Sequence, residues 1–410
     1  MLDGVDLTMT HILNDVCTLI VDCEHKTAPT QSKGIPSIRT PNIGKSRLIL
    51  DNVNRVSDET YKAWTKRAIP QTDDLILARE APIGNVAIIL SNQKVCLGQR
   101  TVLIRPEKNQ VDSQYICYLL LGDEIQGKII SLSNGATVNH LNMRDIRNLE
   151  LPKLPPLPTQ RKIAAILSAY DDLIENNTRR IKILEEMAQA LYSEWFVKFM
   201  FPGHEKVKMV KSELGMVPEG WEVKNVFDLA DVSYGMPLKS KSFSIEKEGT
   251  PVIRIRDIPN GETKTFTTEE ADEKYVVENG DILVGMDGDF HMSIWSGGRA
   301  YQNQRVARFK SKGLIGNYYL FLSLIEPIRF FDLTIVGTTV AHLGDKHIKT
   351  IKILLPSKKI LELAIKEIEP LAIMQLNLKL KNRNLHRTRD LLLPKLISGE
   401  VEVENIDVQM

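Results

Sequence analysis

The side chains best suited to binding chemistry in this 410-residue sequence are basic, amide and imidazole groups at turn-like positions between short β-branched runs. Arg and Lys bind phosphates or guanine edges, and Gln binds adenine. Each of these residues, taken singly, is also compatible with a solvated surface position. The candidates for nucleic-acid contact in the first half are His25, Lys26, Arg39, Arg47, Arg79, Gln99, Arg100 and His140. Those in the second half are Lys239, Lys241, Arg254, Arg256, Arg299, Gln304, Arg305 and His342.

Many of these positions correspond because the chain contains an internal repeat. Gln99-Arg100 recurs as Gln304-Arg305, about half a chain length later. Four further segments recur in the same order: Gly34–Arg39 as Gly249–Arg254, Asp74–Leu77 as Asp281–Val284, Gly135–Leu141 as Gly337–Leu343, and Leu151-Pro152 as Leu355-Pro356. Five ordered matches indicate a tandem duplication.

His140 and His342 stand in equivalent turns, 133–141 and 336–343. A catalytic histidine needs a carboxylate or another partner, and neither turn supplies one nearby in sequence. Two interpretations remain open, namely a structural turn and a loop that faces nucleic acid.

Motifs for catalysis are incomplete wherever they begin. Gly44-Lys45-Ser46 resembles the end of a phosphate-binding loop, but Arg39 stands where its first glycine is required. Glu222-Val223-Lys224 has the form of a nuclease motif without the preceding Pro-Asp pair, and Pro155-Pro156 lacks the flanking residues of an amino-methylation site. No zinc or serine-hydrolase motif is present. We therefore expect no catalytic residue and no metal site in this chain.

Composition excludes several classes of protein. With 43% hydrophobic and 26% charged residues and a net charge of +1, the chain is neither disordered nor histone-like. It has no apolar run long enough to span a bilayer and no signal-peptide pattern. The four cysteines lack C-x-x-C spacing, which favours free thiols in the cytoplasm.

Each half begins with a mixed segment of short strands and helices and changes character at a proline. We predict an α+β fold with two mixed domains, residues 1–153 and 216–355, each followed by a helical region, residues 154–200 and 356–400. Residues 201–215 form a linker and residues 401–410 a tail.

Both helical regions carry apolar residues at alternating spacings of three and four, which is typical of coiled coils. The predicted packing residues are Ile163, Leu167, Ile174, Asn177, Ile181, Leu184 and Leu191 in the first helix and Leu371, Leu378, Leu385 and Leu392 in the second. An antiparallel pair would let each seam cover the other. Asn177 then sets the register of the pair or, alternatively, is solvated at a bend.

Pro370 predicts a break in the second helix, with one piece ending near Ile368 and another starting at Pro370. By the repeat, we expect the first helix to bend near 169–171, where Ser168 or Asp171 could act as a cap. The second seam is the poorer one because one of its rows carries Gln375, Asn382 and Arg389.

Several segments resemble the specificity subunit of type I restriction-modification systems. The resemblance is strongest at residues 154–199, where Pro155-Pro156-Leu157, Gln160 and the closing Trp195-Phe196 resemble that family's central region. Lys211–Trp221 resembles the entry to its second recognition domain, and Leu392–Glu400 its C-terminal signature. Asp74–Gly84 and Gly280–Asp289 look like two variants of one family pattern, although the second lacks the Arg-Glu-Ala-Pro-Ile-Gly form.

This resemblance implies two target-recognition domains, related by a pseudo-twofold axis and separated by two long antiparallel helical regions. Each domain would read half of a bipartite double-stranded DNA site. The implied partners are two modification subunits, which Trp195 and Phe196 would help to dock, and restriction subunits. S-adenosylmethionine, ATP and Mg²⁺ would be used only by those partners, in the cytoplasm and away from any membrane.

Two other functions remain possible from the sequence. The helices could form a scaffold whose mixed domains bind proteins, which predicts no salt-dependent DNA affinity. The chain could also be an autonomous nuclease or methyltransferase, against which the incomplete motifs weigh.

Overall fold

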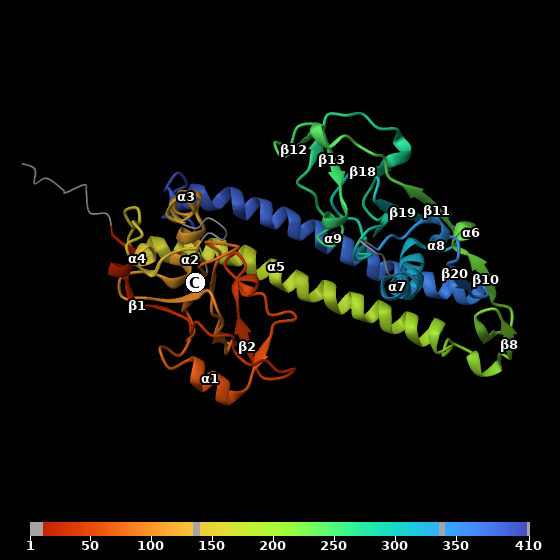
Figure 1. Ribbon diagram of the computed structural model, residues 1–410, viewed down its shortest axis with the longest axis horizontal. Helices are drawn as coiled ribbons and strands as arrows, with labels where there is room; N and C mark the ends of the chain where they lie inside the picture. Colours follow the sequence, from red (N-terminus) through yellow and green to blue (C-terminus); the bar gives the residue numbers. More distant parts are fainter. Residues whose placement is uncertain (1–10, 134–139, 336–340, 408–410) are drawn as a thin grey trace, which may run out of the picture. The chain divides into compact units, whose positions relative to one another are not determined.

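The computed structural model describes residues 11–133, 140–335 and 341–407. The chain divides into two compact units, the first formed by residues 1–175 with 384–410 and the second by residues 176–383. Each unit consists of one mixed domain and a stretch of each of two long helices (Figure 1). Both units are α+β, as the repeat predicts.

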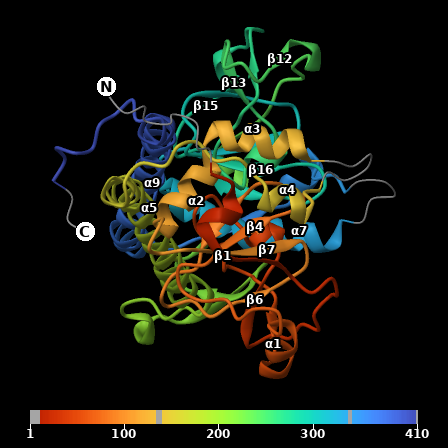
Figure 2. The ribbon, with the colours of Figure 1, turned by 90° about the vertical axis from the view of Figure 1, so that its left-hand side faces the viewer.

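The first unit is built around a four-stranded antiparallel sheet in the order β1-β7-β4-β5. A smaller sheet has the order β3-β2-β6. The strands are β1 (Cys17–Asp22), β2 (Ile35–Ile38), β3 (Arg55–Val56), β4 (Leu75–Ala78), β5 (Val86–Ile88), β6 (Cys96–Leu97) and β7 (Thr101–Pro106). The helices are α1 (Asp58–Trp64), α2 (Ser113–Leu121), α3 (Asp123–Leu132) and α4 (Met143–Arg147), and Figure 2 shows α2 against the larger sheet.

Strand β4 reads as a continuous apolar run because both faces of its sheet are covered. Leu75 and Leu77 face the core that contains α2. Ile76 and Ala78 face a second core together with Ile38 of β2.

The second unit repeats this plan with a four-stranded antiparallel sheet in the order β11-β19-β16-β17. Its other sheets have the orders β12-β14-β13-β18-β15, β10-β20 and β8-β9. The strands are β8 (Met209–Ser212), β9 (Gly215–Pro218), β10 (Glu222–Asn225), β11 (Ala230–Tyr234), β12 (Phe243–Ser244), β13 (Thr250–Ile253), β14 (Phe266–Thr267), β15 (Val276–Val277), β16 (Ile282–Gly285), β17 (Met292–Ile294), β18 (Ala300–Gln302), β19 (Val306–Ser311) and β20 (Lys352–Leu355). The shorter helices are α6 (Val226–Leu229), α7 (Asn317–Thr334) and α8 (Asp345–Ile348).

The repeated aspartates Asp74 and Asp281 have the same structural role at the start of a central strand. Asp74, which is 1% exposed, binds Arg105 through both carboxylate oxygens at 2.7 Å. Asp281, at the position equivalent to Asp74, is 4% exposed and lies 3.7 Å from Arg308, although Arg308 aligns with Leu103 and not with Arg105. Each aspartate also accepts a backbone N–H of its own turn, from Gln71 or Glu278. The repeat at these positions therefore preserves a strand entry.

Two repeated glycines precede β2 and β13 for a conformational reason. Gly34 has φ of +126° and Gly249 has φ of +82°, in the left-handed region that glycine adopts without strain. An added Cβ would lie 2.3 Å from the carbonyl oxygen of Val56 at Gly34, and 2.1 Å from that of Thr267 at Gly249. No larger side chain fits there.

The long helices are α5 (Leu157–Tyr192), continued by a π-helical turn at Ser193–Val197, and α9 (Lys358–Ile397). The predicted break at 368–370 is wrong, since α9 runs continuously through it, and α5 likewise has no break at 169–171. Because Pro370 has no N–H, the carbonyl of Lys366 loses its helical hydrogen bond. Both residues lie on the exposed side of α9, so water can satisfy that carbonyl. Apolar packing at Ile368 holds the helix together on its buried side.

In the second unit the two helices run antiparallel, as predicted. Asn177 of α5 contacts Asn382 of α9, and further along α5 Glu185 lies 3.3 Å from Lys379. The contact positions advance on one helix while they recede on the other, which only an antiparallel pair allows.

The predicted seam residues lie on the inner faces of the helices. Ile163, Leu167, Leu184 and Leu378 are buried. The others are half-buried, namely Ile174, Ile181, Leu191, Leu371, Leu385 and Leu392. Asn177 is 4% exposed and lies inside the continuous helix, not at a solvated bend.

The polar row of α9 is buried and bonded. Gln375, Asn382 and Arg389 are 4%, 9% and 7% exposed. The Tyr318 hydroxyl donates to Gln375 Oε1 at 3.0 Å, and Asn177 Nδ2 donates to Asn382 Oδ1 at 2.8 Å. Arg389 Nη1 binds Asp171 Oδ1 at 2.5 Å. The row that makes the second heptad seam look poor in the sequence is therefore a row of buried polar contacts in the structure.

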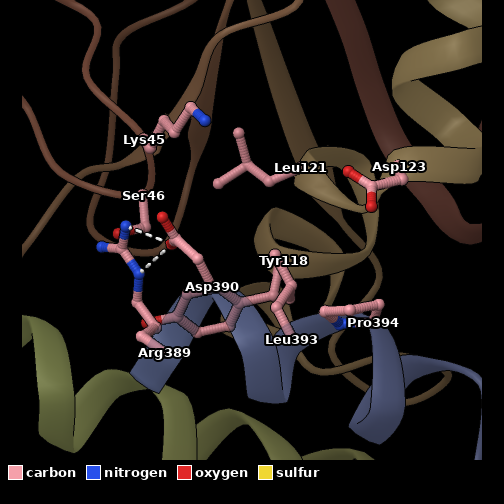
Figure 3. Close-up of a pocket in the computed structure, with 9 residues that line it drawn as sticks. All are labelled: Lys45, Ser46, Tyr118, Leu121, Asp123, Arg389, Asp390, Leu393 and Pro394. Carbon is pink, nitrogen blue, oxygen red and sulfur yellow. Dashed lines mark hydrogen bonds and ion pairs between the residues drawn. The ribbon is translucent and has the colours of Figure 1, made fainter. Parts of the chain in front are cut away.

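Asp171 is the centre of a buried cluster in the first unit, and it is not a helix cap. Besides Arg389 it accepts hydrogen bonds from Ser46 Oγ and, at 2.5 Å, from the Tyr118 hydroxyl. Burial, together with the Asp171 charge, raises the pKa of Tyr118 far above its ordinary value. Figure 3 shows Ser46, Tyr118 and Arg389 around a hollow of about 110 Å³, with Asp390 bonded to Arg389.

Phe196 lies in the core of the second unit and not on a docking surface. It is 5% exposed and packs edge-to-face on Tyr319 at 5.0 Å and against Trp221 at 5.8 Å. Trp195 is half-buried beside it. The apolar pattern after the end of α5 therefore serves the fold first, because Trp221, just before β10, and Tyr319 of α7 cover Phe196.

Candidate nucleic-acid interface

Three segments of the first unit meet at the end of strand β4. The Arg79 N–H donates to the Arg100 carbonyl at 2.9 Å, and the Leu141 N–H donates to the Arg79 carbonyl at 3.0 Å. This junction brings together the loop after β4, the turn before β7 and the segment that contains His140.

The second unit contains the same junction. The Met286 N–H donates to the Arg305 carbonyl at 2.9 Å, and the Leu343 N–H donates to the Met286 carbonyl at 2.8 Å. The repeat therefore preserves a three-dimensional arrangement as well as a sequence pattern. Most of the repeated segments 135–141 and 337–343 lies outside the described residues, which resume at His140 and Ala341.

An exposed arginine beside a carboxylate occupies each junction. Arg100 Nε lies 2.9 Å from Glu80 Oε2, and Arg305 Nε lies 3.1 Å from Asp287 Oδ2. The arginine side chains are 56% and 53% exposed, whereas the carboxylates are 24% and 28% exposed. Glu80 and Asp287 were absent from the sequence-derived candidates, although both follow the repeated strand at the same distance and could have been found by that signal.

His342 does have a carboxylate partner, contrary to the expectation from its own turn. Its Nδ1 lies 2.6 Å from Asp287 Oδ1, and Asp287 stands 55 positions earlier in the chain. The backbones of the same two residues also pair, in a short antiparallel bridge. Asp287 thus joins His342 and Arg305, while His140 is half-buried beside Leu141.

The junction of the second unit opens into a hollow of about 520 Å³. Four sequence-predicted residues line it: Arg254, Arg256, Gln304 and Arg305. Asp289, His291 and Asn303 line it too and were not among the sequence-derived candidates, although Asp289 belongs to the family-like segment Gly280–Asp289. A concave surface of arginine, amide and imidazole groups carries the donors and acceptors that base edges and phosphates require.

Arg39 and Arg254 stand at equivalent turns next to the junctions. The Arg39 N–H donates to Asn42 Oδ1 at 3.1 Å, and the Arg254 N–H donates to Asp257 Oδ2 at 2.9 Å. Arg39 passes over Gly98, where an added Cβ would lie 2.7 Å from its Cγ. Close approach at Gly98 therefore places Arg39 beside Gln99, which is half-buried.

Arg47 and Arg79 are largely buried, and each has a partner within the fold. Arg47 is 16% exposed and binds Asp172 of α5 at 2.8 Å. Arg79 is 15% exposed, and its Nε donates to the Leu141 carbonyl at 2.9 Å. Their sequence positions resemble those of the exposed arginines, but each side chain turns inward to a partner far along the chain.

The remaining candidates are exposed and lie outside the junctions. Arg299 is bound by Glu273 and Glu278, and its hydrogen bonds lower the pKa of Glu273. His25 lies 2.9 Å from Asp22, and Lys26 follows it at the surface. Lys239 and Lys241 flank the turn after β11.

The described residues contain neither a metal-ligand cluster nor a membrane-crossing helix. Within the described ranges, no group of three or more His, Cys, Asp or Glu side chains is arranged to hold a metal ion. None of the helices in that part of the chain combines the length and apolarity needed to cross a membrane.

Comparisons with known proteins agree with this architecture. The family model described as "Type I restriction modification DNA specificity domain" matches residues 9–186 and 218–375. A relative from Methanocaldococcus jannaschii, the type I restriction enzyme MjaIX specificity subunit, is 27% identical over 86% of this chain and 82% of its own length. The HindI specificity subunit of Haemophilus influenzae is 24% identical over 89% of this chain and 94% of its own.

A solved structure shares the fold. The type I restriction-modification S subunit from M. genitalium covers 97% of both chains with a TM-score of 0.57 at 17% identity. The resemblance noted in the sequence is thereby confirmed, since the family model matches both halves of the repeat. The chain belongs to the type I restriction-modification DNA specificity domain family.

Proposed function

We propose that this chain is the DNA-reading subunit of a type I restriction-modification complex and that each of its two units reads one half of a bipartite, asymmetric double-stranded site. The observation that carries the proposal is the duplicated junction, in which Arg100 and Arg305 occupy the same place in two units. One chain with two equivalent but non-identical surfaces is suited to two different half-sites. The relatives are specificity subunits by name, which supports the same reading.

Catalysis belongs to partner subunits in this proposal. Two modification subunits would supply methyl transfer from S-adenosylmethionine, and restriction subunits would use ATP and Mg²⁺. The half-buried Trp195 and exposed apolar side chains of α5 such as Ile183 and Met187 offer surface for docking.

Methylation mapping tests the proposal directly. The chain is coexpressed with its modification subunits in a host without other adenine methyltransferases, and N6-methyladenine is mapped across the genome. We expect one bipartite, asymmetric motif that disappears when this chain is omitted. Methylation of the same motif without the chain contradicts the proposal, and methyl transfer by the isolated chain would indicate an enzyme instead.

Salt dependence separates DNA reading from a protein-binding scaffold. Phosphate contacts release counterions, so the affinity of the assembled complex for its motif should fall about 10³-fold or more between 50 and 200 mM salt. A scaffold would show no such affinity. The measurement is a fluorescence anisotropy titration of a labelled duplex at both salt concentrations, with a shuffled duplex as control.

A further inference from the structure

The paired arginine and carboxylate of each junction point to a specific contact. We propose that Arg100 and Arg305 each read a guanine in one half-site, and that Glu80 and Asp287 are the positioning residues that aim them. The proposal rests on the DNA-reading function above and names the bases and residues involved.

The geometry of the ion pairs leaves the reading face of each arginine available. In both units the carboxylate lies against Nε, at 2.9 Å in the first and 3.1 Å in the second. Among the described residues, the Nη1 and Nη2 groups of Arg100 and Arg305 have no hydrogen-bond partner, and the side chains are more than half exposed. The O6 and N7 acceptors of guanine match two donors of one guanidinium, which is the commonest specific contact of arginine in the major groove.

Both arginines are also held at the backbone, which lowers the entropic cost of aiming a long side chain. Each carbonyl accepts the same hydrogen bond at 2.9 Å, from Arg79 in the first unit and from Met286 in the second. In both units the residue that donates this hydrogen bond comes directly before the carboxylate residue. One short loop therefore holds the arginine's backbone and lies beside its side chain. In the second unit His342 secures the other oxygen of Asp287.

The carboxylate beside each of these two arginines favours a neutral acceptor over a phosphate as its partner. A carboxylate beside Nε offsets the charge of the guanidinium while leaving its outer donors free. Asp289 adds a further negative charge to the hollow of the second unit. Each carboxylate weakens the attraction of its own arginine for a phosphate, whereas a neutral acceptor edge accepts the same hydrogen bonds without that loss. Arg254 and Arg256 line the same hollow and add positive charge beside the pair.

Arg299 provides a matched contrast within the second unit. It is 54% exposed and paired with carboxylates, as Arg305 is. Its Nη1 donates to Glu273 at 3.0 Å and to Glu278 at 3.1 Å, and its Nη2 donates to Glu273 at 2.6 Å. The donors that would read guanine are therefore occupied in Arg299 and available in Arg305.

The experiment compares R100K, R305K and R299K, each assembled with the modification subunits. Lysine keeps the positive charge but cannot form the two-donor contact. Methylated motifs are mapped, and affinities are measured for duplexes with each half-site base pair exchanged in turn. We expect R305K to lower the preference for G·C about 5- to 150-fold at one position of one half-site. R100K should do the same in the other half-site only, and R299K should change neither.

The positioning residues are tested at the same base pair. D287N and E80Q should each relax the position that the corresponding arginine variant relaxes, by a smaller factor. D287E, which keeps a carboxylate at this position, should discriminate better there than D287N does. A purely structural role would lower affinity for all sequences alike and would leave the motif unchanged.

Two outcomes overturn the inference without touching the proposed function. One is a wild-type bipartite motif in which at least one half-site has no G·C pair. The other is an unchanged motif in R100K and R305K complexes that assemble normally. Absence of any bipartite motif in the wild-type complex would instead contradict the proposed function itself.

Discussion

Arginines in this chain share a residue type and turn-like sequence positions, yet they have three different environments. Arg47 and Arg79 turn inward, Arg299 is saturated by two glutamates, and Arg100 and Arg305 present their outer donors to solvent. Composition and spacing identify all of them as candidates. Only the partner of each side chain separates them, and that partner stands far away in sequence.

Glu369 shows how one carboxyl group responds to its surroundings. It lies on α9 under the first turn of α7, where Oε1 accepts the Tyr318 N–H at 3.0 Å. Burial raises the pKa of Glu369 above its ordinary value of 4.5, although the backbone hydrogen bonds oppose the shift. The folded state therefore favours the neutral acid, and this contribution to stability is present below about pH 4.5 and is lost as the pH rises.

E369Q should accordingly gain stability relative to the wild type between pH 4 and pH 7. Glutamine keeps the acceptor oxygen for Tyr318 and removes the cost of ionising a buried carboxyl group, so the gain should grow as the pH rises and Glu369 ionises. Thermal unfolding of both proteins at several pH values measures it. E367Q, at an exposed position of the same helix, is the control and should show no such trend. A wild-type advantage that grows with pH would contradict the prediction.

Helix α9 carries three buried polar residues in a single row at seven-residue spacing, and each binds a different partner. Tyr318 of α7 binds Gln375, Asn177 of α5 binds Asn382, and Asp171 of α5 binds Arg389. The heptad pattern predicts that this row faces inward. It does not predict that the row is satisfied, because two of the partners lie on α5 and one on α7. Buried polar pairs of this kind fix register at a cost in stability.

The pair Asn177 and Asn382 tests that role. N177L alone should destabilise the second unit by about 1–3 kcal/mol, because the Asn382 carbonyl loses this donor while buried. N177L/N382L should recover most of the loss, since both polar groups are replaced by apolar ones. Thermal unfolding of the two variants and the wild type supplies the comparison. Additive losses in the double variant would show that the pair stabilises the helices directly.

The whole molecule places each mixed domain on both long helices of its own unit. In the first unit Ile163 and Leu167 of α5 and Leu396 of α9 join the core of the domain. Ser46 and Tyr118 of the domain reach Asp171, which also holds Arg389. A recognition domain is therefore attached through an apolar contact and a charged cluster together.

Exchange of residues 11–153 for the domain of a relative should alter one half of the methylated motif and leave the other half unchanged. The exchange should succeed when the incoming domain retains hydroxyl groups at the places of Ser46 and Tyr118. S46A/Y118F in the native chain measures the cost of losing them, since Asp171 would then keep Arg389 alone. Methylation mapping reads out the exchanged complexes. A chimera in which both half-sites changed would contradict independent reading by the two units.

The duplication, the α+β character of each half and the antiparallel seam could be predicted from the sequence alone. These features depend on local propensity and periodicity, which neighbouring residues already contain. Tertiary structure alone decided that α5 and α9 are continuous, that Phe196 is a core residue and that Arg47 faces inward. It also decided which side chains lie beside carboxylates. Those contacts join separate segments, since Asp287 and His342 are 55 positions apart and Asp171 and Arg389 are 218 apart. Contacts at that separation depend on how whole elements pack, and no local pattern records them.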